Sequence, residues 1–151
     1  MPKRSAGILV YRIRNGKREY LLAHPGGPFW AKKDVGAWSI PKGEYDEGEE
    51  PLKAAIREFK EELNIDIKGD FKELKPVRQK SGKIIHAFAV EADLDLSRIK
   101  SNTIFIEWPP KSGKQLEIPE VDSCEYFDYE TAKIKMIPAQ VGLIAEVEST
   151  Y

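Results

Sequence analysis

The segment from Pro51 to Leu63 is the feature of the sequence that most restricts the fold. Its apolar residues recur at the i, i+3, i+4, i+7 and i+11 spacing of an amphipathic helix: Leu52, Ala55, Ile56, Phe59 and Leu63. Pro51 suits the first helical turn, and Asn64 suits the left-handed position that ends a helix. The pattern predicts a helix over 51–63 with one face in the core.

The polar side of this helix carries three carboxylates in a place that a helix disfavours. Glu58, Glu61 and Glu62 stand at i, i+3 and i+4, a spacing at which like charges cost about 0.2–0.5 kcal/mol per pair. The last turns also hold the negative end of the helix dipole. Acidic runs on a helix are usually solvated surface, and the helix alone leaves that interpretation open. A hard divalent cation would instead make the cluster favourable.

Segments with strand character surround the helix. The runs 5–13 and 19–24 flank Asn15-Gly16, the strongest short hairpin signal. Further strands are predicted at 37–40, 71–80, 83–91, 102–108 and 125–129, and a second helix at 138–147. Because strands outnumber helices and no linker divides the chain, we expect one domain over 1–151, built on an antiparallel or mixed sheet covered by helices.

Charge and cysteine content limit the partners. The chain has 24 Lys and Arg against 25 Asp and Glu, a net charge of −1, so it lacks the field of a dedicated polyanion binder, and no nucleic-acid polymer is expected as a partner. The longest stretch without acidic or basic residues, 20–31, is too short to cross a membrane. Cys124 cannot form an internal disulfide; we expect a small buried hydrophobe and a reducing, cytoplasmic location.

The charged residues around the helix follow a known motif. From Gly43, five residues lead to Glu49, seven more lead to Arg57-Glu58, and Phe59-Lys60-Glu61-Glu62-Leu63-Asn64-Ile65 completes the run. This run resembles the Nudix box: glycine, five residues, Glu, seven residues, Arg-Glu, an aliphatic residue, any residue, Glu-Glu, any residue, glycine and an aliphatic residue. All the charged positions match.

Two positions depart from the box. Asn64 stands where the box has glycine, but asparagine tolerates the same left-handed geometry, so the helix end should survive. Phe59 stands where a smaller aliphatic residue is usual; it should face the core, which alters local packing and leaves the carboxylates unchanged.

The resemblance implies an α/β fold of the α+β type, an α/β/α sandwich with a mixed sheet. It also implies divalent-metal-dependent hydrolysis of a pyrophosphate bond in a nucleoside diphosphate linked to another moiety, with nucleoside triphosphates and dinucleoside polyphosphates among the candidates. Oxygen ligands select Mg²⁺, or Mn²⁺ as an alternative. The other hypothesis is a catalytically silent Nudix-like domain that binds a nucleotide or a protein; such domains usually lose box carboxylates, and this chain has them all.

Residue roles follow from the same resemblance. Glu58, Glu61 and Glu62 would be metal ligands, with the Gly43 carbonyl as a further candidate. Arg57 and Glu49 look like a pair that pins the loop onto the helix and orients the carboxylates.

The resemblance also implies that one carboxylate outside the box, supplied by a loop on the far side of the sheet, completes the site. Glu117, Glu120 and Glu125 all lie between the Pro109-Pro110 loop and Phe127 and are the candidates. We predict Glu120, which follows Pro119 in irregular chain, as the general base; Glu58 is the alternative base, and an exposed loop acid is the alternative reading of Glu120.

Substrate contacts are predicted from residue type and position. Lys42, beside the box glycine, should meet phosphates, and Tyr45 and Trp30 could stack on a base, although most aromatic residues belong to cores. His24 and His86 are expected to be structural, and the loop 108–114 is either a lid or a turn.

Overall fold

A mixed β-sheet forms the centre of the computed structural model, which describes residues 3–151. Its main path runs β4-β6-β1-β2-β9, with β3 paired to β1 and β5 paired to β6. The strands of this sheet are β1 (Arg4–Arg14), β2 (Lys17–Pro25), β3 (Lys42–Glu44), β4 (Lys72–Glu73), β5 (Val77–Arg78), β6 (Ile84–Glu91) and β9 (Val121–Asp128). Strand β1 runs parallel to β6 and antiparallel to β2, which makes the sheet mixed.

The alternation of side chains along β1 builds a core on each face of the sheet. Ala6, Ile8 and Val10 are buried against helix α1 (Pro51–Leu63), and Leu9 and Tyr11 are buried on the opposite face. Because both faces of β1 are covered, the strand reads as an almost continuous apolar run rather than as an alternating one.

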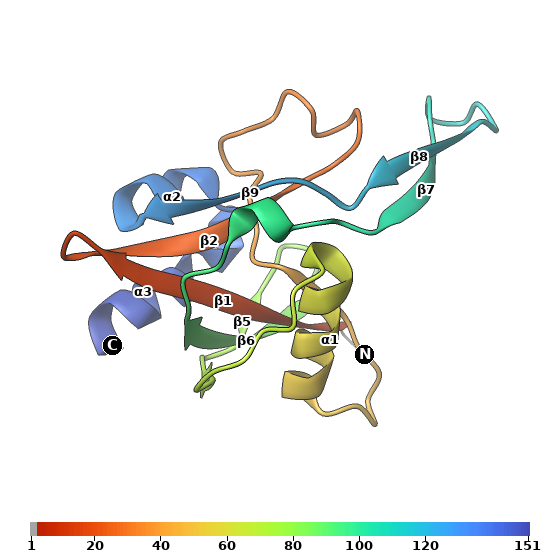
Figure 1. The fold of residues 1–151 in the computed structure, drawn as a ribbon. Helices are drawn as coiled ribbons and strands as arrows, with labels where there is room; N and C mark the ends of the chain where they lie inside the picture. The colour runs from red at the N-terminus through yellow and green to blue at the C-terminus, as the bar shows by residue number, and fades with distance from the viewer. Residues whose placement is uncertain (1–2) are drawn as a thin grey trace.

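Helices cover both faces of the sheet (Figure 1). Helix α1 packs on one face, where Phe59 is fully buried. Helix α2 (Tyr129–Lys135), the short 3₁₀ turn η2 (Pro138–Gln140) and helix α3 (Val141–Thr150) cover the other face. A second 3₁₀ turn, η1 (Leu96–Arg98), lies in the connection that follows β6. The predicted sandwich of helices around a mixed sheet is therefore confirmed.

Two local predictions are confirmed in detail. The β1–β2 hairpin turns at Asn15 and Gly16, whose φ angles of 54° and 76° are those of the type I′ turn that Asn-Gly favours. Helix α1 has the predicted bounds, and Asn64 ends it with φ 61° while its backbone N–H donates to the Lys60 carbonyl. Asparagine thus takes the left-handed place of the glycine in the box.

Two predicted strands are shorter than expected. Residues 37–40 make only single bridges at Trp38 and Ser39, and the strand of this region that pairs with β1 is β3, which begins at Lys42. Pro41 follows directly and has no N–H with which to continue a ladder. The predicted strand 71–80 divides into β4 and β5 around Pro76 for the same reason, and both pieces pair with β6.

The last third of the chain differs most from the prediction. The strand expected at 125–129 is part of the longer β9, and helix α2, which was not predicted, begins at Tyr129. Its signal was present in the sequence, because the Asp128 side chain caps the helix by accepting from the Thr131 N–H. The helix expected at 138–147 consists of η2 followed by α3.

A separate two-stranded sheet projects from the body of the molecule (Figure 1). Strand β7 (Thr103–Glu107) was predicted, but its antiparallel partner β8 (Gln115–Pro119) was not. Residues 108–114 join the two strands. This loop, for which a lid was one interpretation, is the turn at the end of the β7–β8 hairpin.

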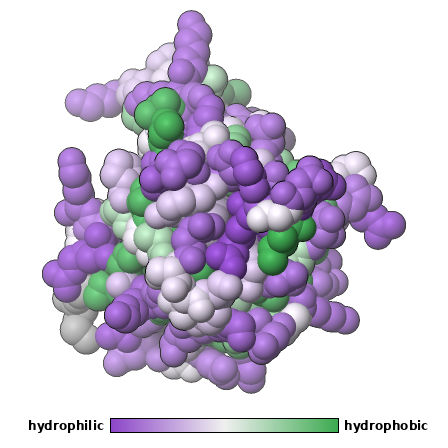
Figure 2. Space-filling view, turned by 90° about the vertical axis from the view of Figure 1, so that its left-hand side faces the viewer, coloured by the Kyte–Doolittle hydropathy of each residue, from purple (hydrophilic) through white to green (hydrophobic). Residues whose placement is uncertain are grey.

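The outer surface is largely polar. Figure 2 shows the face on the left of Figure 1, where hydrophilic residues predominate and apolar residues form separate patches. Among residues 3–151, no helix combines the length and the apolar character needed to cross a membrane.

The positive φ of Asn64 leads to a prediction about stability. Because a β-branched residue is strained in this conformation, Asn64→Val should lower the free energy of unfolding by about 1–2 kcal/mol, whereas Asn64→Gly should change it by less than about 0.5 kcal/mol. Urea denaturation of the three proteins would measure both changes. Equal stability of the valine variant and the parent would show that helix α1 does not need the left-handed end.

Candidate functional site

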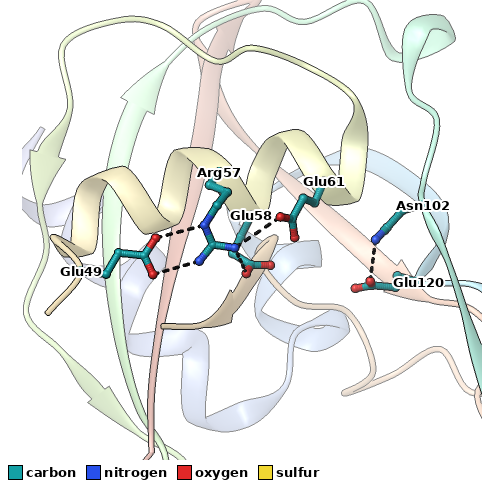
Figure 3. A network of polar contacts seen from close by, with 6 residues as sticks. All are labelled: Glu49, Arg57, Glu58, Glu61, Asn102 and Glu120. Atoms are coloured by element: carbon teal, nitrogen blue, oxygen red, sulfur yellow. Dashed lines mark hydrogen bonds and ion pairs between the residues drawn. The ribbon is translucent and has the colours of Figure 1, made fainter. Parts of the chain in front are cut away.

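Arg57 is the centre of the polar network on helix α1 (Figure 3). Its Nε and Nη2 donate to the two carboxylate oxygens of Glu49 at 3.0 and 3.1 Å, and its Nη1 donates to Glu58 at 2.8 Å and to Glu61 at 3.3 Å. The hydrogen bond to Glu49, opposed by partial burial, raises the pKa of Arg57. The predicted pairing of Arg57 with Glu49 is therefore present, and the guanidinium also partly neutralises two of the three clustered carboxylates.

Glycine at position 43 allows strand β3 to lie directly beside helix α1. A Cβ placed on Gly43 would lie 2.1 Å from the Glu58 carboxyl carbon, a distance that real contacts do not show. The Glu58 side chain therefore occupies the space above the glycine. Burial raises the pKa of Glu58, the charge of Glu61 adds to this, and Arg57 opposes it.

Glu62 is the carboxylate that Arg57 does not reach. Burial is the main cause that raises the pKa of Glu62 to about 8; the negative charges of Glu120 and Glu58 act in the same direction, and Lys42 opposes them. Burial and the nearby Lys83 in turn lower the pKa of Lys42. Without a cation, a large part of Glu62 is therefore protonated near neutral pH.

Glu120 lies across from the helix, between β8 and β9, and faces the carboxylates of α1 (Figure 3). Asn102 holds it: the Asn102 Nδ2 donates to the Glu120 carboxylate at 2.9 Å, and the Glu120 backbone N–H donates to the Asn102 carbonyl at 3.0 Å. The Asn102 backbone N–H also donates to the carbonyl of Glu61 at 3.4 Å. Asn102 thus connects the end of α1 with Glu120, a role that its sequence context did not signal.

The other two acids considered near Glu120 point elsewhere. Glu117 accepts from the Thr103 hydroxyl at 3.1 Å across the β7–β8 hairpin. Glu125 lies exposed on β9, opposite Leu22 of β2. Of these three residues, it is the charge of Glu120 that contributes to the raised pKa values of both Glu58 and Glu62.

The donor set fits a hard divalent cation. Its side-chain donors are carboxylate oxygens; burial, and after it the like charges of the neighbouring carboxylates, raises the pKa values of Glu58 and Glu62, and a bound cation would oppose both effects. Within residues 3–151, no three acidic, histidine or cysteine side chains gather closely enough to form a preassembled metal centre. In this structure Arg57 holds Glu58 and Glu61 by hydrogen bonds, and Asn102 holds Glu120.

A small cavity joins several of the predicted site residues. Lys42, Glu62, Glu120 and Trp30 line a cavity of about 190 Å³. Tyr45 lies elsewhere, because it lines a larger hollow of about 750 Å³ with Glu49 and Arg57. The structure therefore brings Lys42 and Trp30 to Glu62 and Glu120 and places Tyr45 in a different hollow, with Glu49 and Arg57.

Both histidines and the cysteine have structural surroundings. His24 is 7% exposed, and its Nδ1 and Nε2 lie 2.7 Å from Asp122 and 2.5 Å from the Lys33 carbonyl. His86 is half-buried with its ring edge-on to Tyr45. Burial raises the pKa of Cys124 to about 12, so its thiol stays protonated and is a poor nucleophile. The structural interpretation of these residues agrees with their contacts.

Comparison with known proteins gives a consistent picture. A family model described as the NUDIX domain matches residues 2–147. An asymmetrical bis(5'-nucleosyl)-tetraphosphatase of Caenorhabditis elegans is 43% identical over 65 residues, which cover 43% of this chain and 43% of that protein, less than half of its length. An RNA pyrophosphohydrolase of Bartonella henselae is 31% identical over 148 residues, which cover 85% of this chain and 78% of that protein.

Solved structures show the same fold. The binary complex of a C. elegans Ap4A hydrolase matches with a TM-score of 0.65 at 22% identity, over 97% of this chain and 96% of that one. The NUDIX domain of Shewanella oneidensis NrtR, complexed with ADP ribose, matches with a TM-score of 0.66 at 12% identity, over 99% of this chain and 88% of that one.

The raised pKa of Glu62 leads to a prediction for the metal-free protein. Because its folded pKa of about 8 lies above the ordinary value, its contribution to stability is present at low pH and is lost as the pH rises through about 8. In excess chelator, the free energy of unfolding of the parent should fall between about pH 6 and pH 9 by on the order of 1–3 kcal/mol more than that of Glu62→Gln. Denaturant melts at several pH values measure this difference.

The matched control is Glu61→Gln, because the Glu61 carboxylate is exposed on the same helix. This variant should keep the loss of stability that Glu62 causes between about pH 6 and pH 9, because the charge of Glu61 acts on Glu58 and is not among the causes of the shift at Glu62. An identical pH dependence in Glu62→Gln and the parent would contradict the assignment of the shift to Glu62.

Proposed function

Because the chain belongs to the NUDIX family, we propose that it hydrolyses a pyrophosphate bond in a nucleoside diphosphate linked to another moiety, with the help of a divalent cation. The observation that carries this proposal is the meeting of Glu58 and Glu62 from α1 with Glu120 from the opposite side of the site. Glu62 and Glu120 line the same cavity, and burial together with the neighbouring like charges raises the pKa values of Glu58 and Glu62, which supports the proposal. A cation is the partner that makes such an arrangement favourable.

Glu58, Glu61 and Glu62 are the proposed ligands of Mg²⁺ or Mn²⁺, with the Gly43 carbonyl as a further ligand. When bound, the cation would neutralise phosphate oxygens and lower the pKa of water. Arg57 orients the ligands through its contacts with Glu49, Glu58 and Glu61. If Glu58 and Glu61 turned from Arg57 to bind the cation, the guanidinium would keep its two hydrogen bonds to Glu49 and stay in place.

Glu120 is the proposed general base. Its carboxylate accepts a hydrogen bond from Asn102, and this contact orients it toward the space in front of α1. In the proposed reaction Glu120 takes a proton from water as the water oxygen forms a bond to phosphorus. The bond between that phosphorus and the bridging oxygen breaks, and the bridging oxygen leaves with the other phosphoryl group. Lys42, which shares the cavity with Glu62 and Glu120, is placed to meet phosphate oxygens.

The relatives suggest where to look for the substrate. The names of two of them are bis(5'-nucleosyl)-tetraphosphatase and RNA pyrophosphohydrolase. Dinucleoside tetraphosphates are therefore the first compounds to test, and an RNA with a 5'-triphosphate is the second. The near-zero net charge favours the small substrate, because the protein as a whole does not attract a polyanion. Chromatography of the products would identify the bond that breaks.

Metal dependence is the first test of this proposal. Turnover should disappear in excess chelator and return with Mg²⁺ or Mn²⁺, and Glu62→Gln should lower kcat by about 100-fold or more, because it removes a ligand charge and keeps the side-chain volume. Mg²⁺ should also raise the Tm of the parent more than that of Glu62→Gln. Undiminished turnover in chelator, or an equal rise in Tm for the two proteins, would remove Glu62 from the ligand set.

The role of Glu120 has its own test. At saturating Mg²⁺ and substrate, Glu120→Gln should lower kcat by about 100-fold, which is the usual size of a general-base contribution. Glu117→Gln and Glu125→Gln are matched controls because their carboxylates contact Thr103 or lie exposed on β9, and their kcat should stay within about threefold of the parent. If Glu120→Gln also stays within threefold, Glu58 becomes the candidate base.

A further inference from the structure

An apolar groove opens beside Glu120, outside the carboxylate cluster. It has a volume of about 360 Å³, which is within the range of ligand pockets. One wall is formed by Phe29 and Trp30 and the other by the β7–β8 hairpin. The full lining is Pro25, Gly26, Gly27, Phe29, Trp30, Ile104, Ile106, Ile118 and Glu120.

The groove is continuous with the carboxylate cavity. Pro25, Trp30 and Glu120 line both spaces, so a molecule could lie in the groove at one end and reach Glu62 and Lys42 at the other. Glu120 is the one charged residue in the lining of the groove, and it lies at this junction. The groove therefore suits an uncharged group that is attached to a phosphate chain.

The floor of the groove is built by close packing. A Cβ on Gly26 would lie 2.1 Å from the Pro119 carbonyl oxygen, and one on Gly27 would lie 2.6 Å from Ile118 Cδ1. The Gly26 N–H also donates to the Glu120 carbonyl at 3.1 Å. Two glycines thus let the loop after β2 lie directly on the end of β8, and this contact fixes the groove relative to Glu120.

The walls have the shape and chemistry of a site for a flat ring. Phe29 and Trp30 meet edge to face with ring centroids 5.0 Å apart, and the Lys33 ammonium lies 3.7 Å from the Phe29 centroid. Strand alternation places Ile104 and Ile106 on one face of β7 and Phe105 on the other. Ile104 is 40% exposed and lines the groove, so its apolar surface is open to a ligand. Phe105 is 67% exposed, but its side chain lies on the opposite face of β7 and does not line the groove.

We propose that this groove binds the base of the substrate, with the ring held between Trp30 and the isoleucines of the β7–β8 hairpin. The chemical class is a planar, uncharged aromatic ring, because the lining residues offer apolar contact and stacking and include no Lys or Arg. A polyanionic sugar such as a diphosphoinositol phosphate would find no counter-charge in this lining. The proposal rests on the proposed function for the phosphate end, since only that function places a phosphate chain at Glu62 and Lys42.

Nucleosides without phosphate test the groove separately from catalysis. Adenosine, guanosine, cytidine and uridine would be titrated into the ¹⁵N-labelled protein without metal, with ribose 5-phosphate and inositol as ring-free controls. At least one nucleoside should shift the amide or indole signals of 26–30, 104–106 and 118. The controls should not shift them. If all four nucleosides leave these signals unchanged, or shift signals elsewhere, the proposal is wrong.

Variants of the two walls sharpen the test. Trp30→Ala and Ile106→Ser should weaken the binding of the nucleoside by about tenfold, whereas Phe105→Ser, on the opposite face of the same strand, should leave it unchanged. With a nucleotide substrate the two wall variants should raise KM by about tenfold and change kcat by less than about threefold. Equal effects of Ile106→Ser and Phe105→Ser would overturn the proposal.

Two further readouts keep the outcomes distinct. Circular dichroism melts would show that each variant is folded before its binding is compared. A protein that binds nucleosides in the groove but hydrolyses no pyrophosphate compound would contradict the proposed function and leave the groove assignment standing. If the protein hydrolyses a pyrophosphate compound and the wall variants change neither KM nor nucleoside binding, the groove assignment is wrong and the proposed function stands.

Discussion

The close approach of strand β3 to helix α1 determines where the Glu58 carboxylate of the candidate site lies. It depends on a glycine, because any side chain at position 43 would occupy the space of the Glu58 carboxylate. The approach brings the backbone of β3 and the last turns of α1 into one surface, and the pairing of β3 with β1 ties that surface to the middle of the sheet. The core of the sandwich thus supports the site through β3 and through the buried face of α1.

The second constraint is the balance of charge within the carboxylate cluster, where the positive partners are unevenly distributed. Arg57 contacts three carboxylates, and Glu62 is left with Lys42, a partner whose own pKa burial lowers. The negative charges near Glu49 are therefore balanced by Arg57, whereas the negative charge of Glu62 in the cavity lacks a comparable positive partner. A fold optimised for stability alone would not keep a buried carboxylate with a pKa of about 8. This imbalance is the physical reason to regard the cavity side as the working side of the cluster.

Sequence patterns were informative wherever the determining contacts are local. The bounds of α1, its left-handed end at Asn64 and the hairpin at Asn15-Gly16 each depend on residues a few positions apart, and each was predictable. Strand β8 and the break between β4 and β5 depend on partners or on a single proline, and the patterns missed them. Asn102 was not predictable because its contact with Glu120 spans 18 positions and exists only after the hairpin has folded. Glu120 itself was predicted from its loop context, whereas its orientation required the structure.

The β7–β8 hairpin pairs with itself rather than with the main sheet. It joins the body at its base, where Ile118 is 8% exposed and packs against Gly27, and where the Ser101 hydroxyl accepts from the Val121 N–H. Substitutions in its outer part therefore touch neither core of the sandwich. Such an element can change in length and composition through evolution at little risk to folding, while the carboxylates on α1 stay as they are. Divergence within this family could in this way be concentrated in one exchangeable arm, and grafting the arm from a relative would be a direct route to altered selectivity.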